Sequence, residues 1–102
     1  DLLHGEAISI GMVIETILSE MTNGLKADVS SVIRKKIQNV FSLTQINERE
    51  FSELIEWMRN DKKNDDSEIN FTLLKDIGQA EYNKVCSIDQ IEQAIKMYNS
   101  FL

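Results

Sequence analysis

The sequence lacks proline and is poor in several residue types that serve special roles: its 102 residues include one cysteine, one histidine and four glycines. The absence of proline favours helices, because proline removes a backbone donor and blocks the preceding turn. The lone Cys86 excludes a disulfide framework within the chain and suits a reducing compartment. The lone His4 has no second histidine or cysteine at metal-ligand spacing, so the chain carries no complete zinc motif.

Long apolar runs and a positive charge balance are also missing. No stretch approaches the ~18 apolar residues of a membrane-spanning helix, and no signal peptide opens the chain. The formal net charge is −6, and the densest basic stretch, Arg34-Lys35-Lys36, is too short to form the positive face that nucleic acid requires. We therefore expect a cytoplasmic protein that binds neither nucleic acid nor membranes.

The remaining composition is that of an ordinary folded domain. The length corresponds to one domain, and a content of 42% apolar and 27% charged residues is typical of soluble globular proteins. The sequence begins at Asp1 and not at a methionine. We interpret that start as an excised or trimmed boundary.

Apolar residues recur at helical spacing in three segments, which predict helices over residues 4–23, 28–41 and 47–59. The first predicted helix has a wide apolar stripe, which Met12 and Val13 broaden further. We therefore expect other elements to cover this helix on more than one side. The second is expected to begin at an N-cap, Asp28. Its expected buried face comprises Val29, Val32, Ile33, Ile37, Val40 and Phe41.

The third helix has Asn47 and Glu50 at capping-box spacing. Its expected inward positions are Phe51, Leu54, Ile55 and Met58. Residues 60–68 contain no apolar side chain and predict a solvated loop.

Two apolar segments with strand-forming residues, 69–74 and 80–86, predict a hairpin about a turn at 76–79. Ser87 and Gln90 stand at capping-box spacing before a last helix. Its expected inward positions are Ile88, Ile91, Ala94, Ile95 and Tyr98. The prediction is a mainly α fold, a bundle of about four helices with one small β-hairpin. The sequence has no βαβ alternation and no glycine-rich nucleotide loop.

A few residues can carry chemistry, and each has a plainer alternative. His4 can ligate a metal with Glu6 as a second-shell partner, or it can be a surface or capping histidine. The adjacent Lys62 and Lys63 can bind a phosphate or carboxylate as point charges, or they can belong to a solvated charged loop. Cys86 is predicted to be a small buried hydrophobe. The methionines and Trp57 are predicted to fill the core.

Three segments, taken together, resemble the 3-dehydroquinate synthase family. Residues 4–12 (HGEAISIGM) resemble that family's HGEA(V/I)xIGM segment, residues 58–63 (MRNDKK) its M-x-x-D-K-K segment, and residues 71–78 (FTLLKDIG) its F-x-L-L-x-x-I-G strand. The matches follow the family's order and cover almost the whole chain. The first motif is shared with other sugar-phosphate cyclases, so the combination is more specific than any one segment.

The resemblance implies that residues 1–102 form a single C-terminal helical domain of such an enzyme, with the N-terminal NAD-binding domain absent from this chain. The family's enzymes use NAD and zinc or cobalt to convert 3-deoxy-D-arabino-heptulosonate 7-phosphate into 3-dehydroquinate and phosphate, in the shikimate pathway. His4 matches one metal ligand of the family, and the region of Lys62 and Lys63 matches one that contacts the substrate's phosphate. The loop at 64–68 is acidic where the family often has basic and glycine residues.

Further expectations follow from the resemblance. The whole enzyme is expected to be a homodimer, and this chain is expected to pack on its own N-terminal domain. The isolated chain is expected to be inactive, to bind zinc weakly, and to self-associate through apolar residues such as Leu2 and Leu3. Two alternatives remain, namely a related cyclase acting on another sugar phosphate and a stand-alone helical interaction module.

Overall fold

The computed structural model describes residues 4–62 and 68–102, with the backbone alone at 4, 5 and 60–62. In chain order the elements are α1 (His4–Thr22), α2 (Ala27–Val40), α3 (Glu48–Lys62), β1 (Glu68–Asp76), β2 (Gln79–Ser87) and α4 (Ile88–Ser100). The predicted mainly α fold with one hairpin is therefore confirmed. Among the described residues, no helix combines the length and apolar character that crossing a bilayer requires.

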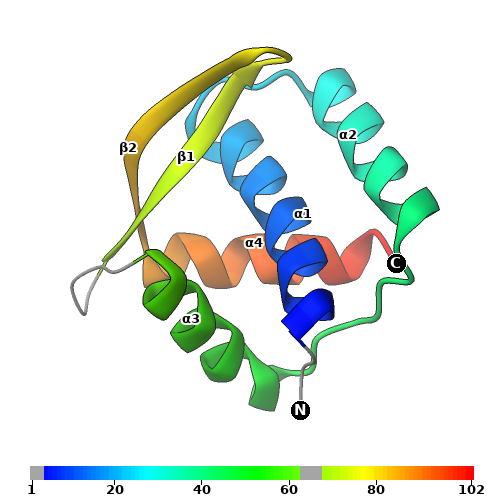
Figure 1. Cartoon of the computed structure of the whole chain (residues 1–102), viewed down its shortest axis with the longest axis vertical. Helices are drawn as coiled ribbons and strands as arrows, with labels where there is room; N and C mark the ends of the chain where they lie inside the picture. Colours follow the sequence, from blue (N-terminus) through cyan, green and yellow to red (C-terminus); the bar gives the residue numbers. More distant parts are fainter. Residues whose placement is uncertain (1–3, 63–67) are drawn as a thin grey trace.

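Helix α1 lies at the centre of the molecule, between α2, α4 and β1 (Figure 1). A helix covered on several sides needs a broad apolar surface, and α1 supplies one with Ile10, Val13, Ile14, Ile17 and Leu18, all buried. Helix α4 crosses behind α1 in this view, and α3 packs beside both (Figure 1). The predicted apolar stripe of α1 is thus wide because several elements pack against this helix.

The inward faces of α3 and α4 agree with their predicted patterns. In α3 the buried side chains are Phe51, Leu54, Ile55 and Met58, and in α4 they are Ile91, Ala94, Ile95 and Tyr98. The predicted capping box of α4 is present, because Ser87 and Gln90 each bind the other's backbone N–H. At the start of α3, the Glu50 carboxylate accepts a bond from the Asn47 N–H at 3.2 Å, which is one half of the predicted box.

The hairpin pairs β1 and β2 antiparallel. Its turn residue Gly78 has φ 79°, a left-handed conformation that glycine adopts without steric cost. Pairing of Phe71 with Lys84 and of Leu73 with Glu81 leaves two β2 residues opposite one β1 residue. This is a β-bulge, and its second residue, Asn83, has φ 59°.

Helix α2 differs from the prediction. Val32, Val40 and Phe41 are 49%, 74% and 43% exposed, and the buried residues of the helix are Ser30 and Ile37. The reason is that α2 packs mainly on α1, and one neighbouring helix covers a narrower strip than the apolar pattern spans.

Two smaller predictions are also wrong. Asp28 lies inside the first turn of α2, whose N-cap is Lys26 with no capping bond from its side chain. The Asp28 carboxylate instead accepts a bond from the adjacent Val29 N–H. Met12 is 42% exposed and does not fill the core, because it lies on the side of α1 that faces solvent beside α2.

Candidate functional site

The predicted site residues lie at the ends of two helices. His4 is the first residue of α1, and Lys62 is the last residue of α3. Lys63 lies outside the described residues. The start of α1 and the end of α3 lie apart in Figure 1. This domain therefore does not bring the predicted metal-ligand position and the predicted phosphate-binding position together at one helix end.

Glu6 is half-buried and lines a hollow beside the first turns of α1. The hollow has a volume of about 390 Å³, and its lining comprises Glu6, Ser9, Phe41, Ser42 and Thr44. One wall is α1 and the other is the segment that joins α2 to α3. The lining combines a carboxylate and hydroxyls with an aromatic ring.

The segment that forms the second wall is held by α4. The Tyr98 hydroxyl donates a hydrogen bond to the Thr44 carbonyl at 2.6 Å. The Asn99 side chain binds both main-chain groups of Ile46, accepting from its N–H at 2.7 Å and donating to its carbonyl at 2.6 Å. Gln45 Nε2 also donates to the Asn99 carbonyl, at 3.2 Å.

The environment of Tyr98 keeps its hydroxyl protonated. Burial, and then the negative charge of Glu6, raise the pKa of Tyr98 to about 12. The phenol therefore stays protonated, and able to donate its hydrogen bond, into the alkaline range where an ordinary tyrosine ionises.

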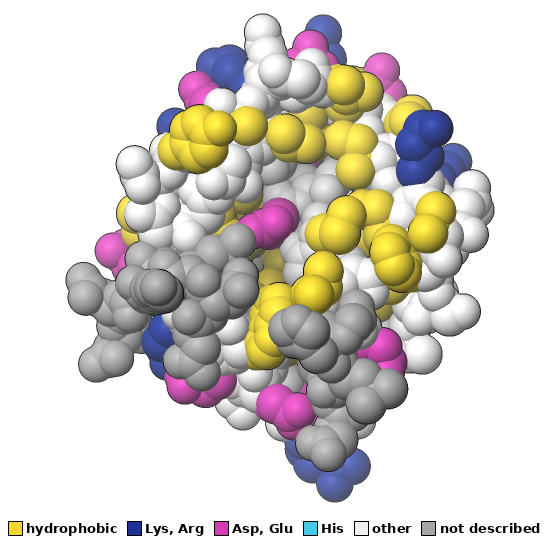
Figure 2. All heavy atoms as spheres, viewed as in Figure 1, with side chains coloured by type: hydrophobic (Ala, Val, Ile, Leu, Met, Phe, Trp, Pro, Cys, Tyr) yellow, Lys and Arg dark blue, Asp and Glu magenta, His cyan; other side chains and the backbone are white. Residues whose placement is uncertain are grey.

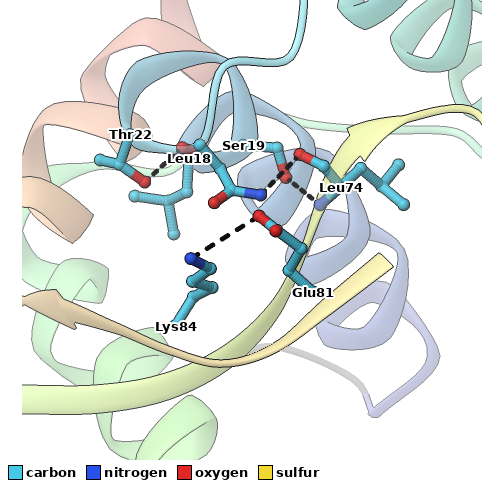
Figure 3. A network of polar contacts seen from close by, with 7 residues as sticks. Leu18, Ser19, Thr22, Leu74, Glu81 and Lys84 are labelled. Atoms are coloured by element: carbon cyan, nitrogen blue, oxygen red, sulfur yellow. Dashed lines mark hydrogen bonds and ion pairs between the residues drawn. The ribbon is translucent and has the colours of Figure 1, made fainter. Parts of the chain in front are cut away.

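At its other end, α1 is bound to the hairpin (Figure 3). The Ser19 hydroxyl accepts a bond from the Leu74 N–H at 2.9 Å and donates to the Glu15 carbonyl at 2.7 Å. Asn23 Nδ2 donates to the Leu74 carbonyl at 3.0 Å. These bonds join the C-terminal end of the helix that begins with the HGEA segment to Leu74, which lies in the FTLLKDIG segment.

A second hollow, of about 240 Å³, lies between α1, α2 and β1. Its walls include Met12, Glu15, Ile33, Ile37 and Thr72. On the face shown in Figure 2, hydrophobic side chains lie in separate groups and the Lys and Arg side chains lie toward the rim. The described Lys and Arg side chains thus form no concentrated basic patch on this face.

Cys86 is buried, as predicted for a small core residue. Burial raises the pKa of the Cys86 thiol, the Glu15 charge raises it further, and a hydrogen bond with Thr22 opposes the rise. A thiol with a raised pKa holds little of the thiolate form that acts as a nucleophile or ligand. Cys86 is thus a packing residue.

The predicted metal ligand is His4, of which the structure describes the backbone. Among the residues that the structure describes, no group of three or more His, Cys, Asp or Glu side chains is placed to hold a metal ion. A neutral imidazole has the right chemistry for one zinc ligand. The described donors therefore do not form a metal site by themselves.

Comparison with known proteins identifies the family. The family model described as 3-dehydroquinate synthase C-terminal matches residues 1–64. The chain belongs to this family. The matched range includes the predicted HGEA and MRNDKK segments, and thus His4, Lys62 and Lys63.

Relatives named 3-dehydroquinate synthase match most of the chain. One from Parabacteroides distasonis is 31% identical over 97 residues, which are 95% of this chain and 28% of that protein. One from Picrophilus torridus is 32% identical over 78% of this chain and 23% of its own length. One from Listeria monocytogenes is 38% identical over 76% and 21% respectively. The chain thus spans about a quarter of the length of the curated relatives it matches, and no solved structure matches it.

Reasoning from the sequence missed the polar contacts that hold this C-terminal 3-dehydroquinate synthase domain together. The helical spacing predicts that Tyr98 lies in the core, but it gives no sign of the bond to Thr44 or of the contacts that Asn99, Ser19 and Asn23 make. These contacts join residues more than fifty positions apart. Such pairs leave no periodic pattern in a single sequence.

Proposed function

We propose that this chain is the C-terminal part of a 3-dehydroquinate synthase, which converts 3-deoxy-D-arabino-heptulosonate 7-phosphate into 3-dehydroquinate and phosphate. One observation carries the proposal: the family match over residues 1–64 includes both the segment that begins at His4 and the segment that ends at Lys63. The relatives' common name supports the same reaction. The reaction belongs to the synthesis of aromatic amino acids, and we expect it in the cytoplasm.

In this proposal His4 supplies one ligand to zinc or cobalt, and Glu6 supports it as a second-shell carboxylate. The metal, when bound, would polarise the substrate hydroxyl that is oxidised and lower its pKa. The remaining ligands would come from outside this chain, which is consistent with the lack of a complete donor group among the described residues. The position of His4 at the first residue of α1 leaves it at the end of a helix anchored in the core.

The lysine pair would bind the substrate's phosphate. Either Lys62, the last residue of α3, or the adjacent Lys63 would act as a point charge that orients the phosphate for elimination. The two are adjacent, and the family pattern does not separate them.

The other components of the enzyme are proposed from the family. NAD would be bound by an N-terminal domain that packs on this one, and the whole enzyme would be a homodimer. We propose that the chain alone is inactive, because it would lack the nucleotide site and two metal ligands.

The decisive experiment reads the gene upstream of Asp1 and assays the protein it encodes. We expect a glycine-rich dinucleotide motif and phosphate release from 3-deoxy-D-arabino-heptulosonate 7-phosphate with NAD and Zn²⁺. Sedoheptulose 7-phosphate and glucose 6-phosphate test the related cyclases in parallel. Activity on one of these alone would replace the proposed substrate, and an open frame without a nucleotide domain would favour a helical interaction module.

Variants then assign the residues. His4→Ala is expected to abolish metal retention and turnover. Lys62→Gln and Lys63→Gln, made separately, are expected to differ, with the larger rise in KM marking the lysine that meets the phosphate. Lys84→Gln is the control, because this half-buried lysine lies on β2, outside the proposed site, where it pairs with Glu81 at 3.6 Å. If both lysine variants behave like the control, the phosphate role is wrong.

A further inference from the structure

Helix α1 lies at the centre of the fold, yet two of its large apolar side chains are exposed. Ile8 and Met12 are 43% and 42% exposed, and their spacing of four residues puts them on the same side of the helix. In Figure 1, α4 passes behind α1, α2 and the hairpin lie on either side of it, and no described element crosses in front. Among the described residues, the central helix thus keeps one open side.

The two hollows follow one another along this side of α1. Glu6 and Ser9 line the hollow near the start of the helix, and Met12, Thr16 and Ser19 line the hollow farther along it. These five residues recur at intervals of three or four, which is the spacing of a single helix face. The hollows therefore lie on one side of α1.

Helix α2 borders the same side with apolar residues. Ile33 lines the hollow between α1, α2 and β1, and Phe41 lines the hollow beside the first turns of α1. Val40 lies two helical turns after Ile33 on the same face of α2 and is 74% exposed. We call this surface the open face, and it comprises Ile8, Met12, Ile33, Val40 and Phe41. Apolar side chains gathered on a surface in this way are typical of an interaction site.

The length of the family's proteins indicates what covers the open face. The chain matches a family model described as C-terminal and spans 28%, 23% and 21% of three relatives. Most of such a protein therefore lies outside this chain. A second copy of the chain is a poorer partner, because each copy carries a formal net charge of −6. The hollows also place the carboxylates of Glu6 and Glu15 at this surface, where those of a second copy would repel them.

We infer that the open face is covered by the N-terminal part of the same polypeptide, which contributes a mainly apolar surface. This inference rests on the proposal that the chain is the C-terminal part of a longer enzyme, and it identifies the face that the rest of the enzyme covers. It also accounts for α2, whose apolar pattern is wider than the strip that α1 buries. Val40 follows the spacing of a buried residue because the rest of the enzyme buries it.

The first test measures thiol labelling of Val40→Cys in the full-length protein that contains this chain. A maleimide reagent is applied in buffer and in denaturing urea, and the rate at this position is followed by mass spectrometry of the peptide. We expect Val40→Cys to react at least about tenfold more slowly in buffer than in urea, because a covered thiol reacts only after local opening.

Val85→Cys is the matched control for this labelling. Val85 is 53% exposed on β2, outside the open face, and we expect Val85→Cys to react at nearly the same rate in buffer and in urea. If Val40→Cys also reacts equally fast in both, the open face is uncovered in the whole protein and the inference is overturned.

A measurement without any substitution covers the case in which Val40→Cys does not fold. Hydrogen peroxide oxidises exposed methionines in preference to buried ones. Met12 is 42% exposed in this domain and Met58 is 1% exposed. In the full-length wild type we expect Met12 to be oxidised as slowly as Met58. Oxidation of Met12 that is clearly faster than that of Met58 would refute the inference.

A photo-crosslink identifies what covers the face. Lys36 is exposed and lies one turn before Val40 on α2, so the photoreactive residue p-benzoylphenylalanine placed there sits at the rim. We expect a cross-linked product of monomer mass that joins position 36 to a peptide outside residues 1–102. A product of doubled mass would assign the face to a second copy and overturn the inference.

Failure of the proposed function is separate from failure of this inference. It would appear as an absence of phosphate release from the sugar phosphate by a wild-type protein whose Met12 is nevertheless protected. Loss of protection in a protein that does release phosphate would refute the inference alone.

Discussion

Two buried helical serines allow the hydrogen bonds of this fold to be tested with the same substitution. Ser19 on α1 is 1% exposed and Ser30 on α2 is 0% exposed. The Ser19 hydroxyl accepts the Leu74 N–H across 55 positions of sequence. The Ser30 hydroxyl has no hydrogen-bond partner within the described part of the chain. Ser→Ala is therefore expected to have opposite effects at the two sites.

The magnitude at Ser19 follows from what remains after the hydroxyl is removed. Leaving a buried donor unpaired costs about 1–3 kcal/mol, and the half-buried Leu74 places the expected cost in the lower part of that range. The Glu15 carbonyl keeps its partner within the helix. Alanine regains about 0.5 kcal/mol of helix propensity. The net loss is about 1 kcal/mol, which lowers Tm by about 4–8 °C in a domain of this size.

At Ser30, removal of the hydroxyl and the higher helix propensity of alanine both favour the folded state. Removing an unpaired buried hydroxyl relieves a desolvation cost, and alanine favours the helix by about 0.5 kcal/mol. We expect Ser30→Ala to be neutral or to raise the free energy of unfolding.

Urea unfolding of the wild type and both variants measures the difference directly. Amide hydrogen exchange gives a local check, because the Leu74 amide should exchange faster in Ser19→Ala and at the wild-type rate in Ser30→Ala. If the two variants have equal stability, or if Leu74 protection is unchanged in Ser19→Ala, the assigned role of the Ser19 hydroxyl is wrong.

Further outcomes are expected from three other features. Gly78 has φ 79°, so Gly78→Ala should lower the free energy of unfolding by about 1 kcal/mol. Gly11→Ala should raise the free energy of unfolding by about 0.5–1 kcal/mol, because the added Cβ would lie at an ordinary 3.6 Å from the Trp57 ring. Equal Tm values for the two variants in thermal unfolding would contradict this expectation. The pKa of Tyr98 is raised to about 12, so the folded state prefers the protonated phenol. The contribution of this group to the free energy of unfolding should be constant below about pH 10 and should fall as the pH rises toward about 12. The fall should be at most about 1.4 kcal/mol per pH unit. Urea melts between pH 9 and 11.5 should show that fall in wild type and a smaller one in Tyr98→Phe. The Cys86 thiol, buried and with a raised pKa, should react with a disulfide reagent at pH 8 in urea and not in buffer; fast reaction of the native chain would refute its assignment to the core.

The elements were predictable because each carries a local signal. Helical spacing of apolar residues located α1, α3 and α4, and strand formers around the Gly78 turn located the hairpin. The exposed face of α2 was not predictable, because Val32 and Val40 follow the same spacing as buried residues. Burial depends on whether a neighbour covers that spacing, and a sequence window does not contain the neighbour.

The residues of the candidate site also fall into a group that was predictable from local sequence and a group that was not. His4, Glu6, Lys62 and Lys63 were found because they lie in contiguous motifs, and their roles stay predictions. Tyr98 and its partner Thr44 are separated by 54 positions. Only the packing of α4 against the segment between α2 and α3 makes them a pair.

The hydrogen bonds that Ser19 and Asn23 make with Leu74 also affect the tendency of the hairpin to aggregate. A two-stranded sheet has two edges whose unpaired backbone groups can template pairing with another chain. On β1, Ser19 and Asn23 occupy both main-chain groups of Leu74. On β2, the bulge at Asn83 interrupts the regular ladder that an incoming strand would need. The contacts of Ser19 and Asn23 with β1, and the bulge at Asn83 on β2, thus disfavour edge-to-edge pairing of the hairpin with another molecule.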